Sequence, residues 1–306
     1  MSSTVLCRYR VTENETLTRG YMMIMKIKTT IFIVAIALIS ELCAGVPVPS
    51  FSYFGKIKDE YGNPYTAESD VNILCFVNGS EISRSSVKNY GAHVNFLISV
   101  VVENAESSYA AYAVSTDSVV EFFIENDDGE KIAAFSAEEI PRVGLSGQYA
   151  SLDLTTGADE NHNGISDIWE AQTSLTYWWL TGIYPDAITA GDDLDGDGAS
   201  NYAEYVAGTS AADSADVFKI TKMNKVASGT DSVLFSMQFY SANGRSYYVR
   251  EQPDLSDDKT RRLARYSTSM DGPWTSSYLS GQGEWITIYI QTPDDSDSAF
   301  YSLEVQ

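Results

Sequence analysis

The stretch DDLDGDG at residues 192–198 places four aspartates and two glycines in seven positions, and the sequence then becomes helix-like through ASNYAE at 199–204. Carboxylates this close together repel one another, and the repulsion grows where water is excluded. Such crowding is stable when a cation lies among the acids. This short stretch therefore decides how the middle of the chain folds, and it indicates a metal-binding loop.

The spacing of the acids is that of a twelve-residue calcium loop. Counted from Asp193, oxygen donors fall at alternate positions, and a glycine at the sixth position allows the sharp turn. A backbone carbonyl at the seventh position and a glutamate at the twelfth, which binds with both oxygens, complete the pattern. The expected ligands are Asp193, Asp195, Asp197, the carbonyl of Ala199, Asn201 and Glu204.

A second stretch, DENHNGISDIWE at 159–170, has the same residue types at the same positions. Two polar turns in an acidic protein would not be expected to repeat both the glycine at position 6 and the glutamate at position 12. The expected ligands are Asp159, Asn161, Asn163, the carbonyl of Ile165, Asp167 and Glu170. This loop supplies three ligand carboxylates and loop 193–204 supplies four, so we expect two Ca²⁺ sites, the second the tighter.

Each loop is expected to run directly into a helix. The pairs Asp167/Glu170 and Asn201/Glu204 have capping-box spacing, and Gly208 is placed to end the second helix. No helical pattern enters either loop from its N-terminal side. The prediction is a loop–helix unit, and not the helix–loop–helix lever that opens in calcium sensors.

These residues resemble a known kind of repeat. The loop at 159–170 followed by DDLDGDGASNYAEYVAGTSAADSADVFKI (192–220) is similar to the thrombospondin type-3-like, EF-hand-like calcium-binding repeat of secreted bacterial modular proteins. The resemblance covers about 157–216 and implies calcium binding next to a small β domain. The tail GTSAADSAD departs from the family's usual GTDPTD, so no extra acidic ligand is carried over from it.

The flanks are typical of β structure, with alternating apolar residues and turn signals. The expected fold is mainly β, with two β-sandwich domains, immunoglobulin- or fibronectin-III-like, joined by a small α calcium-binding loop–helix module. The expected boundaries are 46–156, 157–215 and 216–306. Hairpin turns are predicted at Asn78–Gly79, Asp128–Gly129 and Asn243–Gly244, and a strand is predicted at DVFKI, 216–220.

The N-terminus is typical of a secretory signal peptide. Residues 25–45 run from lysines through an apolar segment to small residues, so 1–24 is interpreted as an upstream extension and Met25 as the initiator. An uncleaved membrane anchor is the alternative. Cleavage would leave Cys75 as the one cysteine, which its apolar surroundings assign to the core. The expected location is secreted, cell-surface or periplasmic, with no membrane span in the mature chain.

The net charge and the lack of catalytic sequence motifs limit the classes of function that we expect. The net charge of −22 argues against nucleic acid as a partner, and no catalytic motif surrounds His93 or His162, so no enzyme is expected. The prediction is a structural or binding protein. A carbohydrate-binding or adhesion module, a dockerin-like docking module and, least favoured, a glycoside-processing hydrolase are the alternatives. Expected partners are calcium and either a cell-surface glycan or another extracellular protein.

Overall fold

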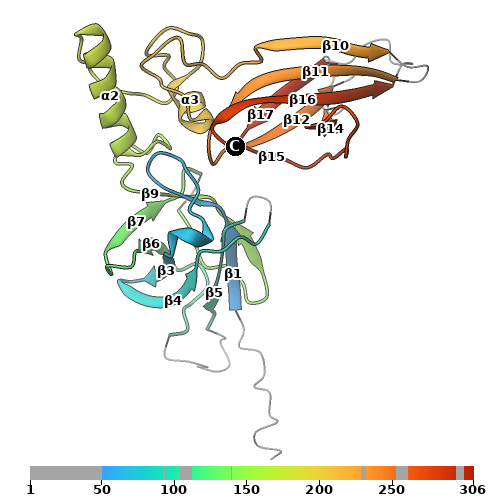
Figure 1. Ribbon diagram of the computed structural model, residues 1–306. Helices are drawn as coiled ribbons and strands as arrows, with labels where there is room; N and C mark the ends of the chain where they lie inside the picture. The colour runs from blue at the N-terminus through green and yellow to red at the C-terminus, as the bar shows by residue number, and fades with distance from the viewer. Residues whose placement is uncertain are drawn as a thin grey trace, which may run out of the picture. The chain divides into compact units, whose positions relative to one another are not determined.

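Strands dominate the structure, as the mainly β prediction requires. The computed structural model describes residues 50–91, 94–103, 112–138, 140–228, 232–252, 261–293 and 300–306, in which four sheets and two α-helices are seen (Figure 1). Neither of these helices is long and apolar enough to cross a membrane. The predicted extension at 1–24, the signal peptide at 25–45 and His93 lie outside the described residues.

Two sheets form the region from residue 50 to residue 156. In the three-stranded sheet, β1 (Ser50–Gly55) pairs antiparallel with β5 (Phe96–Val101) and parallel with β8 (Tyr149–Ser151). The other sheet has six strands in the order β2–β9–β7–β6–β3–β4, and a short 3₁₀ helix, η1 (Ala67–Ser69), precedes β3. Its strands are β2 (Ile57–Lys58), β3 (Asn72–Val77), β4 (Ser80–Ser86), β6 (Glu121–Glu125), β7 (Lys131–Phe135) and β9 (Leu154–Thr156).

One hydrophobic core joins these two sheets. Along β1 every second side chain is buried, Phe51 and Tyr53 among them, which is the period of a strand with one face covered. The Tyr53 ring meets Phe122 of the six-stranded sheet edge-on, with centroids 5.3 Å apart. Cys75 lies fully buried in this core, and burial raises the pKa of its thiol to about 12, as expected for a core residue.

Two further sheets form the region from residue 222 to the C-terminus. The first has the order β10–β11–β16–β14; in the second, β12 pairs with β13, β15 and β17. The strands of the first are β10 (Lys222–Ser228), β11 (Ser232–Ser241), β14 (Tyr266–Ser267) and β16 (Glu284–Pro293). Those of the second are β12 (Ser246–Gln252), β13 (Arg262–Leu263), β15 (Leu279–Ser280) and β17 (Phe300–Val305).

These sheets also share a hydrophobic core. It contains Phe239 and Ile288 from the first sheet and Tyr247 and Val249 from the second. The predicted strand at 216–220 is wrong. The chain there is irregular and the strand begins at Lys222, while Phe218 packs on this core. Its aromatic side chain fits a core equally well from a loop.

Two of the three predicted hairpin turns are confirmed. Asn78 and Gly79 both have positive φ, 50° and 74°, and join β3 to β4, and a turn ending at Gly129 joins β6 to β7. The third prediction is wrong, because Asn243–Gly244 connects β11 to β12, which belong to different sheets. Only Gly244 of that pair has positive φ, so the turn lacks the geometry of a two-residue hairpin.

The middle of the chain contains both helices. Helix α2 (Asp167–Thr181) follows the first acidic loop and α3 (Asn201–Ala207) follows the second, as predicted, and no helix immediately precedes either loop. A small core joins them: Trp169 of α2 and Tyr205 of α3 meet edge-on at 5.4 Å, beside the buried Ile165 and Ile188. The acidic loops are therefore held by packed helices and not by loose turns.

Candidate metal centre

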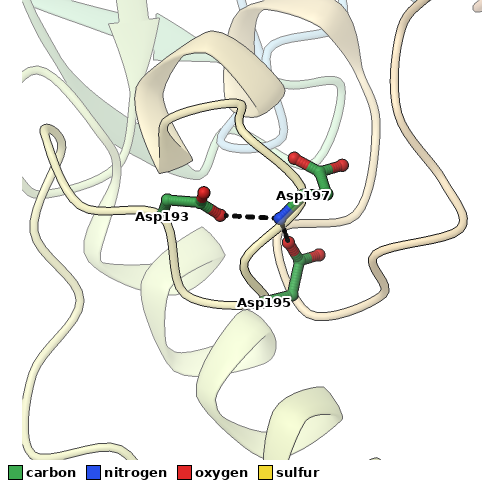
Figure 2. Close-up of side chains that lie close together, drawn as sticks. All are labelled: Asp193, Asp195 and Asp197. Atoms are coloured by element: carbon green, nitrogen blue, oxygen red, sulfur yellow. Dashed lines mark hydrogen bonds between the residues drawn. The ribbon is translucent and has the colours of Figure 1, made fainter.

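Three aspartates of the second loop come together. Ligand oxygens of Asp193, Asp195 and Asp197 all lie within 4.8 Å of one another, and Figure 2 shows them arranged around the backbone of the loop. Within the described residues, this is the group of acidic, histidine or cysteine side chains close enough together to hold one metal ion. Three acids at alternate positions of the sequence thus lie close together in the folded loop.

Backbone N–H groups fix the first aspartate. Asp193 Oδ1 accepts hydrogen bonds from the N–H of Gly196 at 2.8 Å and of Asp197 at 3.2 Å, and its Oδ2 accepts from Gly198 at 2.9 Å. Gly198 has φ +99°, a conformation that favours glycine, which explains the residue at the sixth position. The loop is wound around Asp193 and presents the following carboxylates to one side.

Three carboxylate oxygens of this loop are buried without a hydrogen-bond partner in the described part of the chain. Asp195 and Asp197 each use Oδ1 to accept a backbone N–H, from Asp197 at 3.2 Å and from Ala199 at 2.7 Å, while Oδ2 of each has none. Glu204 is only 1% exposed; its Oε1 accepts from Thr209 at 3.4 Å and its Oε2 has no partner. Burial of an anionic oxygen without a hydrogen-bond partner raises the free energy of the folded state unless a cation binds the oxygen.

The pKa values of two carboxyl groups in this loop are also raised by their surroundings. Burial, followed by the nearby charges of Asp195 and Asp197, raises the pKa of Glu204 to about 8. Burial also raises the pKa of Asp195, with the charges of Asp197, Asp193 and Asp213 adding to the effect. A divalent cation would reverse both influences, since it favours the ionised carboxylate.

Asn201, the expected ligand at the ninth position, is braced in the loop. Its Oδ1 accepts from the N–H of Leu194 at 3.2 Å, and its Nδ2 donates to the carbonyl of Thr189 at 2.7 Å. Both ends of the buried amide are therefore engaged by the backbone. In calcium loops this position often acts through a water molecule, which fits a side-chain oxygen that already accepts a backbone N–H.

The first loop is wound in the same way. Asp159 accepts from the N–H of Asn163 at 3.0 Å and of Gly164 at 2.9 Å, which matches the role of Asp193 in the second loop. Asp167 at the ninth position accepts from the N–H of Glu160 at 3.2 Å. The two loops therefore share a backbone design, and they differ in what fills the centre.

Amide groups occupy the centre of the first loop. Asn161 donates through Nδ2 to both oxygens of Glu170 at 3.2 Å, and Asn163 donates to Glu170 Oε1 at 2.6 Å. The Oδ1 atoms of the two asparagines accept backbone N–H groups. For a cation to bind here, these amides have to turn their oxygens inward and give up the bonds to Glu170.

The helix caps differ from the sequence prediction. Ser166 and Ser200, at the eighth position of each loop, are the N-caps, accepting from the N–H of Trp169 and of Ala203 at 3.2 Å each. The predicted capping pairs begin one residue later, in the first turn. A serine oxygen reaches the free N–H groups of a helix start, which explains why both loops have serine where sensor loops have an apolar residue. Gly208 ends α3 with φ 74°, as predicted.

The buried Arg245 was not predicted from the sequence. Arg245 is 4% exposed and donates to the carbonyl oxygens of Gly62, Tyr61 (2.9 Å) and Tyr205 (3.0 Å). It thereby contacts the turn before η1 and the end of α3 from a position next to β12. Because these partners are 40 and about 180 residues away in sequence, no local pattern could have identified it.

Comparison with known proteins adds no assignment: no protein-family model, no curated protein and no solved structure matches this chain.

Proposed function

We propose that this chain is a secreted, modular calcium-binding protein in which two thrombospondin type-3-like loop–helix units stiffen the connection between two β-sandwich regions. The observation that carries the proposal is the set of three buried, unpartnered carboxylate oxygens, Asp195 Oδ2, Asp197 Oδ2 and Glu204 Oε2. Ligand oxygens of Asp193, Asp195 and Asp197 lie within 4.8 Å of one another, and the charges of Asp195 and Asp197 act on Glu204, which supports a cation with several oxygen ligands at the second loop.

Calcium fits these donors better than other common metals. All the expected side-chain ligands are oxygen atoms, and no cysteine or histidine stands at a ligand position, which disfavours zinc and copper. Magnesium prefers six ligands in strict octahedral geometry and retains water, whereas calcium accepts six to eight oxygens from a flexible loop. A loop with four carboxylates and a carbonyl donor matches calcium.

The contacts of the helices support a structural role. Ser166, the cap of α2, also donates from Oγ to the carbonyl of Glu60 at 2.6 Å, and the carbonyl of Tyr205 in α3 accepts from Arg245. The start of α2 and the end of α3 are therefore coupled to the β-rich flanks as well as to the acidic loops. A cation that orders the loops would also order these junctions.

Calorimetric titration of calcium into the chain from Val46, which retains every described residue, tests the proposal. We expect two sites, and we expect Glu204→Gln and Asp195→Asn each to abolish the tighter one. Asp192→Asn is the matched control, because this exposed acid adjoins the loop but stands outside the ligand positions. Absence of heat up to several millimolar calcium, or equal loss in the control, would sink the proposal.

We also expect the site at 193–204 to be the tighter of the two. Its unpartnered oxygens need no rearrangement, whereas the site at 159–170 has to break the amide bonds to Glu170. Asp159→Asn should therefore remove the weaker transition and leave the stronger one. If Asp159→Asn removed the tighter site instead, the inference from the asparagine hydrogen bonds to Glu170 would be wrong.

A further inference from the structure

An aromatic pair marks a pocket on the sheet that contains β11 and β16. Tyr240 and Trp285 are direct cross-strand partners, and their rings meet edge-on with centroids 5.6 Å apart. Both are exposed, Trp285 by 57% and Tyr240 by 43%. Two neighbouring exposed rings of this kind form an apolar contact surface at the end of the strands.

The pair borders a defined cavity of about 450 Å³. Thr209, Asp216 and Lys219, from the segment after α3, line the same cavity. Its size is within the range of small-ligand sites, about 300–1,000 Å³. The lining thus combines aromatic rings with a carboxylate, an ammonium and a hydroxyl, which gives a mixed apolar and hydrogen-bonding surface.

Polar side chains continue along the same face of β11 and β16, away from the pocket. Two residues further along the strands, Gln238 faces Thr287 and donates to its hydroxyl at 3.5 Å, and the next pair on that face is Ser236 with Tyr289. The core-facing residues between them, such as Phe239 and Ile288, are buried. The outer face is therefore a flat strip of amides and hydroxyls that starts at the aromatic pair.

A sugar ring matches this surface. The apolar C–H face of a pyranose can lie on the negatively polarised face of an indole, while its hydroxyls both donate and accept hydrogen bonds. Asp216 and Lys219 give the pocket one charge of each sign, and the net charge of −22 disfavours anionic polymers, so a neutral ligand fits the charge of the site. An apolar peptide would bury the charged groups of Asp216 and Lys219 without offering them further hydrogen bonds.

We propose that the pocket between Trp285 and Asp216 binds a pyranose unit of a neutral oligosaccharide, with the sugar ring on Trp285 and further units along the outer face of β11 and β16. None of the proposed saccharide contacts is an expected calcium ligand, although Thr209 of the pocket donates to Glu204 Oε1 at 3.4 Å. Saccharide binding is therefore measured in saturating calcium, where its loss is a separate result from loss of calcium binding.

The test is titration of the chain from Val46 in millimolar calcium with neutral hexasaccharides of glucose, mannose, xylose and N-acetylglucosamine, and with an oligogalacturonate for comparison. We expect at least one neutral hexasaccharide to bind. Trp285→Ala should weaken its binding at least about ten-fold, and Tyr240→Ala by a smaller factor. Trp179→Ala is the matched control, because Trp179 is 79% exposed on α2 and lies outside the pocket; it should leave affinity unchanged.

A second measurement on the unaltered chain guards against misfolded variants. In ¹⁵N-labelled protein, the indole N–H resonance of Trp285 should shift on addition of the saccharide, and that of Trp179 should not. Failure of every neutral probe to bind, or affinity unaffected by Trp285→Ala, would overturn the proposal. Binding of the oligogalacturonate alone would also overturn it.

Discussion

Glu204 is the residue on which calcium binding is expected to depend most, because it is the last residue of the second loop and lies buried within α3. Its carboxyl can be accommodated there in two ways, by taking up a proton or by binding a cation. The raised pKa, about 8, reports the first, and the acidic neighbours make the second the more favourable in the presence of calcium. Proton and calcium are therefore expected to compete at this one side chain.

This competition predicts an unusual pH dependence. A carboxyl whose pKa is raised on folding keeps more protons in the folded state, so it lowers stability progressively as pH rises from about 4.5 to about 8. In chelator, the melting temperature should fall between pH 5 and pH 8, and saturating calcium should reduce or reverse that slope. Glu204→Gln should flatten the slope in chelator; an unchanged slope would show that Glu204 does not titrate in this range.

At the scale of elements, the two loop–helix units are built alike but anchored differently. Ser166 and Ser200 both cap a helix, yet Ser166 is fully buried and also donates to Glu60 at 2.6 Å. Loss of a cap costs about 1 kcal/mol, and loss of a buried hydrogen bond adds to it.

We therefore expect Ser200→Ala to lower the free energy of unfolding by about 1 kcal/mol and Ser166→Ala by about 2 kcal/mol or more. Urea unfolding in saturating calcium measures both. Ser214→Ala, at an exposed position between the second loop and β10, is the control and should change little. Equal losses for Ser166 and Ser200 would mean that the contact with Glu60 contributes nothing.

The elements also show what a sequence can and cannot predict. Alternation in β1 and the turn at Asn78–Gly79 are local patterns, and both predictions are confirmed. The glycine spacing of the two acidic loops is also local: Gly164 and Gly198 have positive φ, 85° and 99°, while calcium binding stays a prediction. The turn at Asn243–Gly244 has the same residues but joins two sheets, since pairing of β11 with β16 is decided by side chains some fifty residues apart. The parallel pairing of β1 with β8 and the buried Arg245 depend on contacts still more distant.

At the scale of the whole molecule, Arg245 links elements that are far apart in the chain. It supplies hydrogen bonds to three backbone carbonyls, and those of Gly62 and Tyr205 would remain buried without this donor if the side chain were shortened. Each unsatisfied carbonyl costs about 1–3 kcal/mol.

Arg245→Met should accordingly destabilise the chain by about 3 kcal/mol or more, measured by urea unfolding in calcium. Arg262→Met is the control, because Arg262 forms an exposed ion pair with Glu251 at 3.0 Å and should cost under about 1 kcal/mol. Similar losses in the two variants would show that Arg245 does not hold these elements together.

The most direct test of the central claim is a crystal structure of the chain from Val46 grown in calcium, with an anomalous difference map to locate the metal. The account predicts a peak with Asp195, Asp197 and Glu204 oxygens at about 2.3–2.6 Å, and Glu204 binding through both oxygens. A calcium-saturated crystal with no peak in loop 193–204, or with Glu204 turned away from it, would contradict the account.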